Sequence, residues 1–173
     1  MPQLEYPGQM SSGDGPTLIA FDGSAAAREA VVAAAALLKP RATLVLTVWD
    51  AALAQAAVGQ PPDVAMTPVV DPATVLTFDE ALRDHAERLA NDGAALARSL
   101  GLDAEPLAVA DVGDIARTIA QVAREHKAAM IVVGSRGLSG LRARFEGSTS
   151  KGVVKHAPCP VVVVHDADAE EHV

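Results

Sequence analysis

A glycine-rich stretch near the C-terminal end of the chain carries the clearest chemical signal. Gly134 ends an apolar run and is followed by Gly137 after two other residues. Nine residues further on, Gly147 precedes Ser148 and Thr149, which open a predicted helix. Glycine lets a ligand approach the main chain closely, and a helix N-terminus offers unpaired N–H groups to an anion. The stretch is therefore predicted to wrap a phosphate chain, with plain turn formation as the alternative.

An acidic residue follows the first apolar run of the chain. Residues 17–21 are predicted to form a buried strand that ends in the turn Asp22-Gly23-Ser24. Ser24 is typical of a helix N-cap, where its side-chain oxygen accepts a free backbone N–H. A carboxylate such as that of Asp22 can accept two hydroxyl hydrogen bonds, as a ribose diol requires. Asp22 is therefore a candidate nucleotide contact, with a turn or capping role as the alternative.

Basic residues accompany the glycines. Arg136, Arg142 and Arg144 lie within or beside the glycine-rich stretch, and a guanidinium matches the geometry of a phosphate. For each arginine alone, a solvated loop charge is the alternative. Mg²⁺ is compatible with a bound triphosphate because the hydrated ion needs few protein ligands, although the sequence shows no dedicated metal cage.

Composition excludes several classes of function. The chain has 173 residues and a formal net charge of -8, so it is a poor candidate for binding nucleic acid or anionic membranes. No apolar stretch is long enough to span a bilayer. The lone cysteine, Cys159, rules out an internal disulfide and fits a reducing, cytoplasmic location. None of the 5 histidines has metal-ligand spacing, and any phosphate site must be local.

Predicted helices alternate with apolar runs that position these residues. The predicted strands cover residues 17–21, 43–48, 105–110, 130–133 and 161–164. The predicted helices cover residues 25–38 and 79–100, a segment whose inner face is Ile115, Ile119, Val122 and Ala123, and residues 148–156. Continuous apolar strands separated by helices indicate a parallel sheet covered on both faces. The order predicts an α/β fold, a single doubly wound sandwich with right-handed crossovers.

Two tails and one long segment flank the predicted elements. Residues 1–16 are rich in Gly, Pro and Ser and are predicted to form a flexible tail rather than a signal peptide. Residues 166–173 are predicted to form an acidic C-terminal tail. Residues 50–77 contain many prolines and are predicted to form a long variable loop, with one helical turn near 51–57. One domain is expected over residues 17–165.

The spacing Gly-x2-Gly-x9-Gly-Ser/Thr resembles the nucleotide-binding signature of the universal stress protein family. Three further segments are similar to that family: the first strand and its turn at 18–24, the second strand at 46–48, and the ending at 155–161. The resemblance covers about residues 17–165. It implies a five-stranded parallel sheet in the order 3-2-1-4-5, an adenine-nucleotide alpha-hydrolase-like fold, and a homodimer paired through the last strand at 161–165.

The same resemblance implies a ligand and a role for each site residue. The ligand would be ATP, with AMP or cAMP as alternatives. Asp22 would hold the ribose hydroxyls, the backbone of Val48 would meet the adenine, and the glycine-rich stretch would hold the phosphates. The candidate nucleotide-binding residues are Ala20, Phe21, Asp22, Val48, Gly134, Arg136, Gly137, Gly147, Ser148 and Thr149.

The implied strand order agrees with a general rule for doubly wound sheets. Ligands bind beyond the carboxyl ends of the strands, at the point where the winding direction reverses. In the order 3-2-1-4-5 the reversal lies between the first and fourth strands. Asp22 ends the first of these strands and Gly134 ends the other, so both are predicted to face one crevice.

Several functions are compatible with these observations. The leading interpretation is a nucleotide-binding regulatory protein of the stress response, in which the nucleotide stabilises one conformation or dimer state. A slow ATPase or phosphoryl-transfer enzyme is the alternative. That enzyme would need a positioned base, for which Glu146 is a weak candidate, and no P-loop spacing is present. A cAMP or AMP binder and a structural dimer with an empty crevice are the remaining interpretations.

Overall fold

The computed structural model describes residues 15–38, 41–51, 72–111, 113–135 and 148–165. Its elements are β1 (Thr17–Ala20), α1 (Ala25–Leu37), β2 (Ala42–Asp50), α3 (Pro72–Ser99), β3 (Asp103–Asp111), α4 (Ile115–Glu125), β4 (Met130–Gly134), α5 (Ser148–His156) and β5 (Val161–Val164). Every predicted strand and helix is present. Among the described residues, no helix has the length and apolar character needed to cross a membrane.

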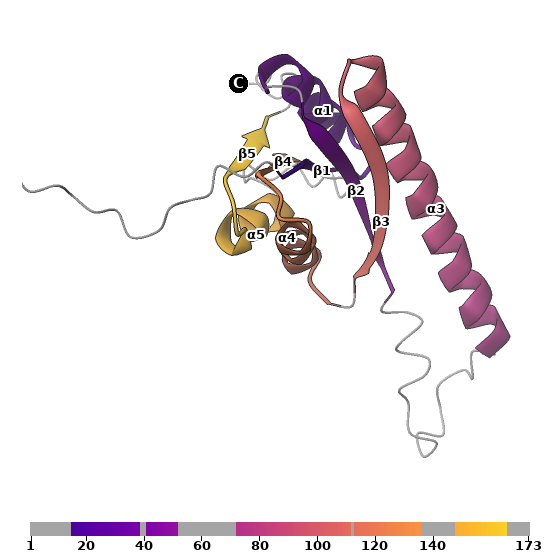
Figure 1. Ribbon diagram of the computed structural model, residues 1–173. Coiled ribbons are helices and arrows are strands. Elements are labelled where there is room, and N and C mark those ends of the chain that lie inside the picture. Colours follow the sequence, from indigo (N-terminus) through magenta and orange to yellow (C-terminus); the bar gives the residue numbers. More distant parts are fainter. Residues whose placement is uncertain (1–14, 39–40, 52–71, 112, 136–147, 166–173) are drawn as a thin grey trace, which may run out of the picture.

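The strands form one parallel sheet in the order β3-β2-β1-β4-β5, which confirms the expected fold class and topology. Figure 1 shows α3 running along β3 and β2, while α4 and α5 lie together on the opposite side of the sheet. Successive residues of a strand point to opposite faces. On β1, Ile19 therefore joins the core beneath α1 and α3, whereas Leu18 joins the core beneath α4 and α5.

The long helix α3 begins earlier than predicted, at Pro72. The last part of the predicted loop at 50–77 is thus helical, because proline is well tolerated at the first helical position, where its missing N–H is not needed. Of the rest of that loop, the structure describes only Asp50 and Ala51; the predicted helical turn near 51–57 otherwise lies outside the described residues.

The buried face of α4 differs from the predicted one. Ile115 is 40% exposed, and Ala116 is buried in its place, together with Ile119 and the other predicted residues. The reason lies in the neighbouring helix α5. A Cβ on Gly152 would stand 2.6 Å from the Cβ of Ala116, so the two helices meet at these two small residues.

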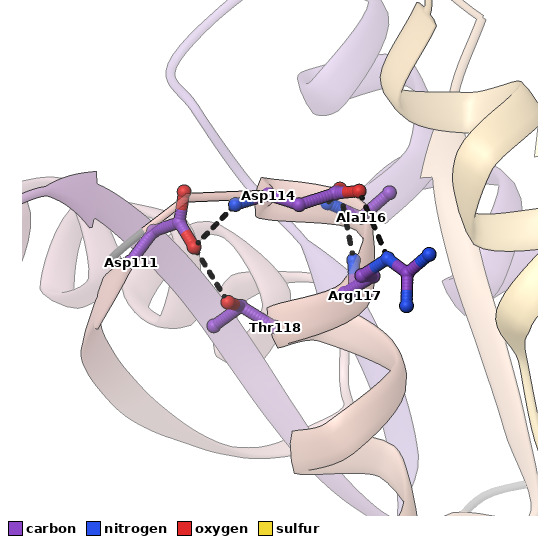
Figure 2. Close-up of polar contacts among 5 residues, drawn as sticks. All are labelled: Asp111, Asp114, Ala116, Arg117 and Thr118. Atoms are coloured by element: carbon purple, nitrogen blue, oxygen red, sulfur yellow. Dashed lines mark hydrogen bonds and ion pairs between the residues drawn. The ribbon is translucent and has the colours of Figure 1, made fainter.

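Two acidic residues fix the start of α4 (Figure 2). The side chain of Asp114 accepts the N–H groups of Ala116 at 3.0 Å and Arg117 at 3.2 Å, as an N-cap residue does. Buried Asp111, at the end of β3, accepts the N–H of Asp114 at 3.0 Å and the hydroxyl of Thr118 at 2.8 Å. The turn from β3 into α4 is therefore held by side-chain oxygens at two successive points.

Close packing fixes the start of α1 against the end of β4. A Cβ added to Gly134 would stand 2.7 Å from the backbone C and O atoms of Ala26, in the first turn of α1. Ser24 caps the same turn, since its hydroxyl oxygen accepts the N–H of Ala27 at 3.1 Å, which confirms its predicted role. The first helix can lie over β4 because Gly134 has no side chain.

We expect Gly134→Ala to lower the free energy of unfolding by about 1–3 kcal/mol, because the new methyl group meets backbone atoms that cannot rotate away. Gly113→Ala is the matched control, since its Cβ would meet no heavy atom within 4 Å. Urea denaturation of both variants measures the difference. Equal effects at the two positions would contradict the packing role of Gly134.

The N-cap predicts a pH dependence. The backbone N–H of Arg117, then the N–H of Ala116 and the positive charge of Arg117, lower the pKa of Asp114. A lowered pKa in the folded state stabilises the protein above the unfolded-state pKa, and this contribution is lost as pH falls through the folded-state pKa. Asp114→Asn should therefore lower the melting temperature at pH 7, and the difference from wild type should shrink below about pH 4.

Asp92→Asn, at an exposed position of α3, is the control for that measurement. Thermal unfolding is followed for the three proteins at neutral and acid pH. If the melting temperature of Asp114→Asn lies below that of wild type by the same amount at both pH values, the charge of Asp114 does not contribute to stability.

Candidate functional site

The carboxyl ends of the parallel strands form one edge of the sheet, named here the carboxyl edge. β1 and β4 pair directly, with Ile19 opposite Val132. β1 ends at Ala20, two residues before Asp22, and β4 ends at Gly134. The two residues that were predicted to share a site therefore lie at the ends of neighbouring strands on the same edge of the sheet, where the strand order reverses.

Asp22 is held in a defined turn. Its Oδ1 atom accepts the N–H of Ser24 at 2.9 Å, and Gly23 between them has a φ of 79°, a conformation that favours glycine. A carboxylate has two oxygens with several lone pairs, so a turn bond is compatible with a ligand hydroxyl on the same side chain. The capping alternative and the ligand role of Asp22 are thus not exclusive.

The backbone of Val48 faces the same region. The N–H of Phe21 donates to the carbonyl of Leu46 at 2.8 Å, so the backbone polar groups of Leu46 point toward β1. Because the direction of the backbone N–H and C=O groups repeats every second residue of a strand, these groups of Val48 also point toward the β1 side. Because the pairing of β1 with β2 ends at Ala20 and Leu46, Val48 lies beyond the part of β2 that pairs with β1.

The side chains of two predicted site residues pack in the core. Phe21 is 3% exposed, and its ring lies where a Cβ on Gly93 would approach within 2.8 Å, in the layer formed by α1 and α3. The side chain of Val48 packs with the opposite core, beneath α4 and α5. Any contact of these two residues with a ligand therefore has to come from the main chain.

The structure describes only part of the predicted phosphate-binding stretch. Ser148 and Thr149 are exposed at the first two positions of α5. A helix that connects parallel strands runs back across the sheet, so this N-terminus is directed toward the carboxyl edge. The other predicted residues of the stretch lie outside the described residues: Arg136, Gly137 and Gly147, with Arg142, Arg144 and Glu146.

Acidic groups at the carboxyl edge are concentrated at the ends of β2 and β3. Asp50 and Asp111 lie opposite each other there, and the N–H of Ala51 donates to the carbonyl of Asp111 at 3.0 Å. This charge disfavours an anion at that end of the edge. Within the described ranges, no group of three or more His, Cys, Asp or Glu residues is arranged to hold a metal ion.

One feature of the edge was not predicted from the sequence. The hydroxyl of Thr47, a residue that is 4% exposed, donates to the carbonyl of Phe21 at 2.8 Å. A threonine in an apolar strand is expected simply as a β-branched strand former. Only the register of β1 against β2 shows that its hydroxyl reaches the end of the neighbouring strand.

A family model and a curated relative both match most of this chain. Residues 16–165 match the family model described as the universal stress protein family. A curated relative from Thermus aquaticus, named as a universal stress protein, is 33% identical over 147 residues, which cover 85% of this chain and 96% of that protein.

Solved structures share the fold. The universal stress protein UspA from Lactobacillus plantarum superposes with a TM-score of 0.66 at 24% identity, covering 87% of this chain and 97% of its own. An Arabidopsis thaliana family member with AMP bound has a TM-score of 0.55 at 19% identity, covering 89% and 94%. A universal stress protein in complex with cAMP has a TM-score of 0.53 at 22% identity, covering 88% and 99%. Because the family model matches residues 16–165 and the Thermus aquaticus relative is 33% identical over 85% of this chain, this chain belongs to the universal stress protein family.

Proposed function

We propose that this protein binds an adenine nucleotide, ATP before AMP or cAMP, at the carboxyl ends of β1 and β4. The observation that carries the proposal is the pairing of these two strands, because the strand that leads into Asp22 is the direct neighbour of the strand that ends at Gly134. The Gly-x2-Gly-x9-Gly-Ser spacing begins at that same point, with Gly134. A hydroxyl acceptor and a phosphate-binding sequence thus start from neighbouring strands at the reversal point of the sheet.

The surroundings favour one orientation of the nucleotide. The adenine would meet the backbone of Val48, which faces the β1 side beyond the paired part of β1. The ribose would lie at Asp22, and the phosphates toward residues 134–149, including Arg136, Gly137 and Gly147. The acidic ends of β2 and β3 support this orientation because they repel phosphate toward β4 and the N-terminus of α5.

Two solved structures of the same fold support the ligand class, since one holds AMP and the other cAMP. We place ATP first because the Gly-x2-Gly-x9-Gly-Ser spacing resembles the signature of the ATP-binding members of the family. A triphosphate would bring Mg²⁺, which keeps most of its water and takes few protein ligands; the exposed hydroxyls of Ser148 and Thr149 are compatible with that.

The proposed role is regulatory. A nucleotide at this place would contact β1, β2, β4 and α5 at once, and so stabilise one arrangement of these elements for a partner to recognise. The proposal includes a homodimer through 161–165, because β5 is an edge strand of the sheet and an open edge can pair with a second copy. It also includes a cytoplasmic location, where ATP is available, and a role in the stress response.

The ribose contact can be tested with matched acidic variants. Asp22→Asn keeps an oxygen for the Ser24 N–H but loses the carboxylate, so its affinity for ATP should fall about tenfold or more. Asp50→Asn, at the exposed end of the neighbouring strand, should bind as wild type or slightly more tightly. Isothermal titration calorimetry with ATP, AMP and cAMP measures all three proteins. Wild-type protein that binds none of these nucleotides would end the proposal, and equal affinities would remove Asp22 from the site.

The dimer can be tested on one strand. The carbonyls of Pro160 and Val164 accept N–H groups from the β4 side, so alternate residues, among them Val163, present their backbone to the open edge. Val163→Pro should therefore convert a dimer into a monomer and leave the β4–β5 pairing in place. Val162→Pro, at the adjacent position that faces β4, should instead lower the melting temperature. Sedimentation velocity that finds Val163→Pro fully dimeric would exclude this interface.

A further inference from the structure

The hydroxyl of Thr47 joins the ends of β1 and β2 by a bond outside the backbone ladder. It donates to the carbonyl of Phe21 at 2.8 Å, and both residues are almost fully buried, Thr47 at 4% and Phe21 at 3% exposure. Such a bond is shielded from water, so it is not exchanged for solvent hydrogen bonds as a surface contact would be.

The bond lies where β1 leaves the sheet. In an uninterrupted parallel ladder, a residue whose N–H donates to Leu46 would use its carbonyl to accept the N–H of Val48. Phe21 makes the first of these bonds, at 2.8 Å, and its carbonyl accepts the Thr47 hydroxyl. The hydroxyl of Thr47 thus takes the place of the Val48 N–H as the donor to this carbonyl, where the chain turns away from the sheet toward Asp22. The N–H of Val48 is not needed for this bond.

Each partner in this bond is the chain neighbour of a proposed ligand contact. Phe21 precedes Asp22, which would hold the ribose, and Thr47 precedes Val48, whose backbone would meet the adenine. The Oδ1 atom of Asp22 also accepts the N–H of Ser24 at 2.9 Å, and this bond restricts the conformation of the turn. Two bonds therefore hold the residue before the ribose contact to the strand that carries the base contact: the bond from the Phe21 N–H to Leu46 and the bond from the Thr47 hydroxyl to Phe21.

We propose that Thr47 is a positioning residue for the nucleoside part of the site: its hydroxyl sets the carboxylate of Asp22 relative to the backbone of Val48. This inference rests on the proposed function and extends it to a residue that does not touch the ligand. A purely structural role would affect stability alone. A positioning role would also affect how well the protein distinguishes a ribose from a sugar that lacks the hydroxyls.

Another threonine of β2 provides a matched control. Thr43 is 2% exposed, and its hydroxyl donates to the carbonyl of Arg41 at 3.2 Å. It lies at the opposite, amino-terminal end of the strand, away from the carboxyl edge. Thr43→Val and Thr47→Val therefore remove the same group from equally buried positions of one strand, and only the second changes the proposed site.

The experiment measures the affinities for ATP and for 2′,3′-dideoxy-ATP by titration calorimetry, with melting temperatures as the check on folding. Wild type should prefer ATP by about tenfold or more, because the carboxylate of Asp22 loses its hydroxyl partners in the analogue. Thr47→Val should reduce this preference about threefold or more, since a misplaced acceptor gains less from the hydroxyls. Thr47→Ser, which keeps the hydroxyl, and Thr43→Val should retain the wild-type preference.

The possible results separate this inference from the function on which it rests. Wild type that binds neither nucleotide would overturn the proposed function and the role of Thr47 together. Wild type that prefers ATP while Thr47→Val keeps the same preference would overturn the role of Thr47 alone. An equal loss of preference in Thr43→Val would show a general effect of the strand and also overturn it. If Thr47→Val does not fold, the same comparison of Thr47→Ser and Thr47→Ala decides the question.

Discussion

Direct parallel pairing of β1 with β4 is the constraint on which the rest of this structure depends. Parallel strands end at the same edge of a sheet, so the polypeptide leaves β1 and β4 at neighbouring points of that edge. From that edge, β1 leads into α1 on one face, while β4 is followed by α5 on the other. The two connecting segments thus diverge to opposite faces of the sheet at neighbouring strand ends, which is the place where doubly wound sheets bind ligands.

Small residues make this arrangement compact. With aromatic residues at only 3% of the chain, the helices contribute mainly alanine to the core, as at Ala30 in α1 and Ala94 in α3, both fully buried. Helices with such short side chains can lie close to the sheet. Gly134 then has a double significance: the first turn of α1 fits above it, and the proposed phosphate-binding stretch begins at it. The glycine that was predicted to allow close approach of a ligand is thus also required by packing.

Much of the fold follows from local chemistry, which is why the sequence predicted it. Apolar runs predicted the strands, and the hydroxyl of Ser24 predicted the start of α1. Features that depend on contacts between helices and strands could not be predicted from the sequence. Ile115 is exposed because α5 approaches α4 at Ala116 instead, and the bond of Thr47 depends on the register of two strands. Of the candidate site, the placement of Asp22 and Gly134 at the carboxyl edge was predicted. The core positions of the Phe21 and Val48 side chains were not predicted, and they are compatible with the backbone contact expected of Val48.

The electrostatics of the edge explain how an acidic protein can offer a place to an anion. The formal net charge is -8, but individual carboxylates near the edge are committed to local donors. Asp111 accepts the Asp114 N–H and the Thr118 hydroxyl, and Asp114 accepts two N–H groups at the start of α4. These carboxylates offset the positive end of the α4 dipole. The α5 N-terminus instead begins with two exposed hydroxyl residues, Ser148 and Thr149, and no acidic residue occurs in its first turn. Of the two helix N-termini on this face, the one at α5 is therefore the better able to attract phosphate, in agreement with the proposed orientation of the nucleotide.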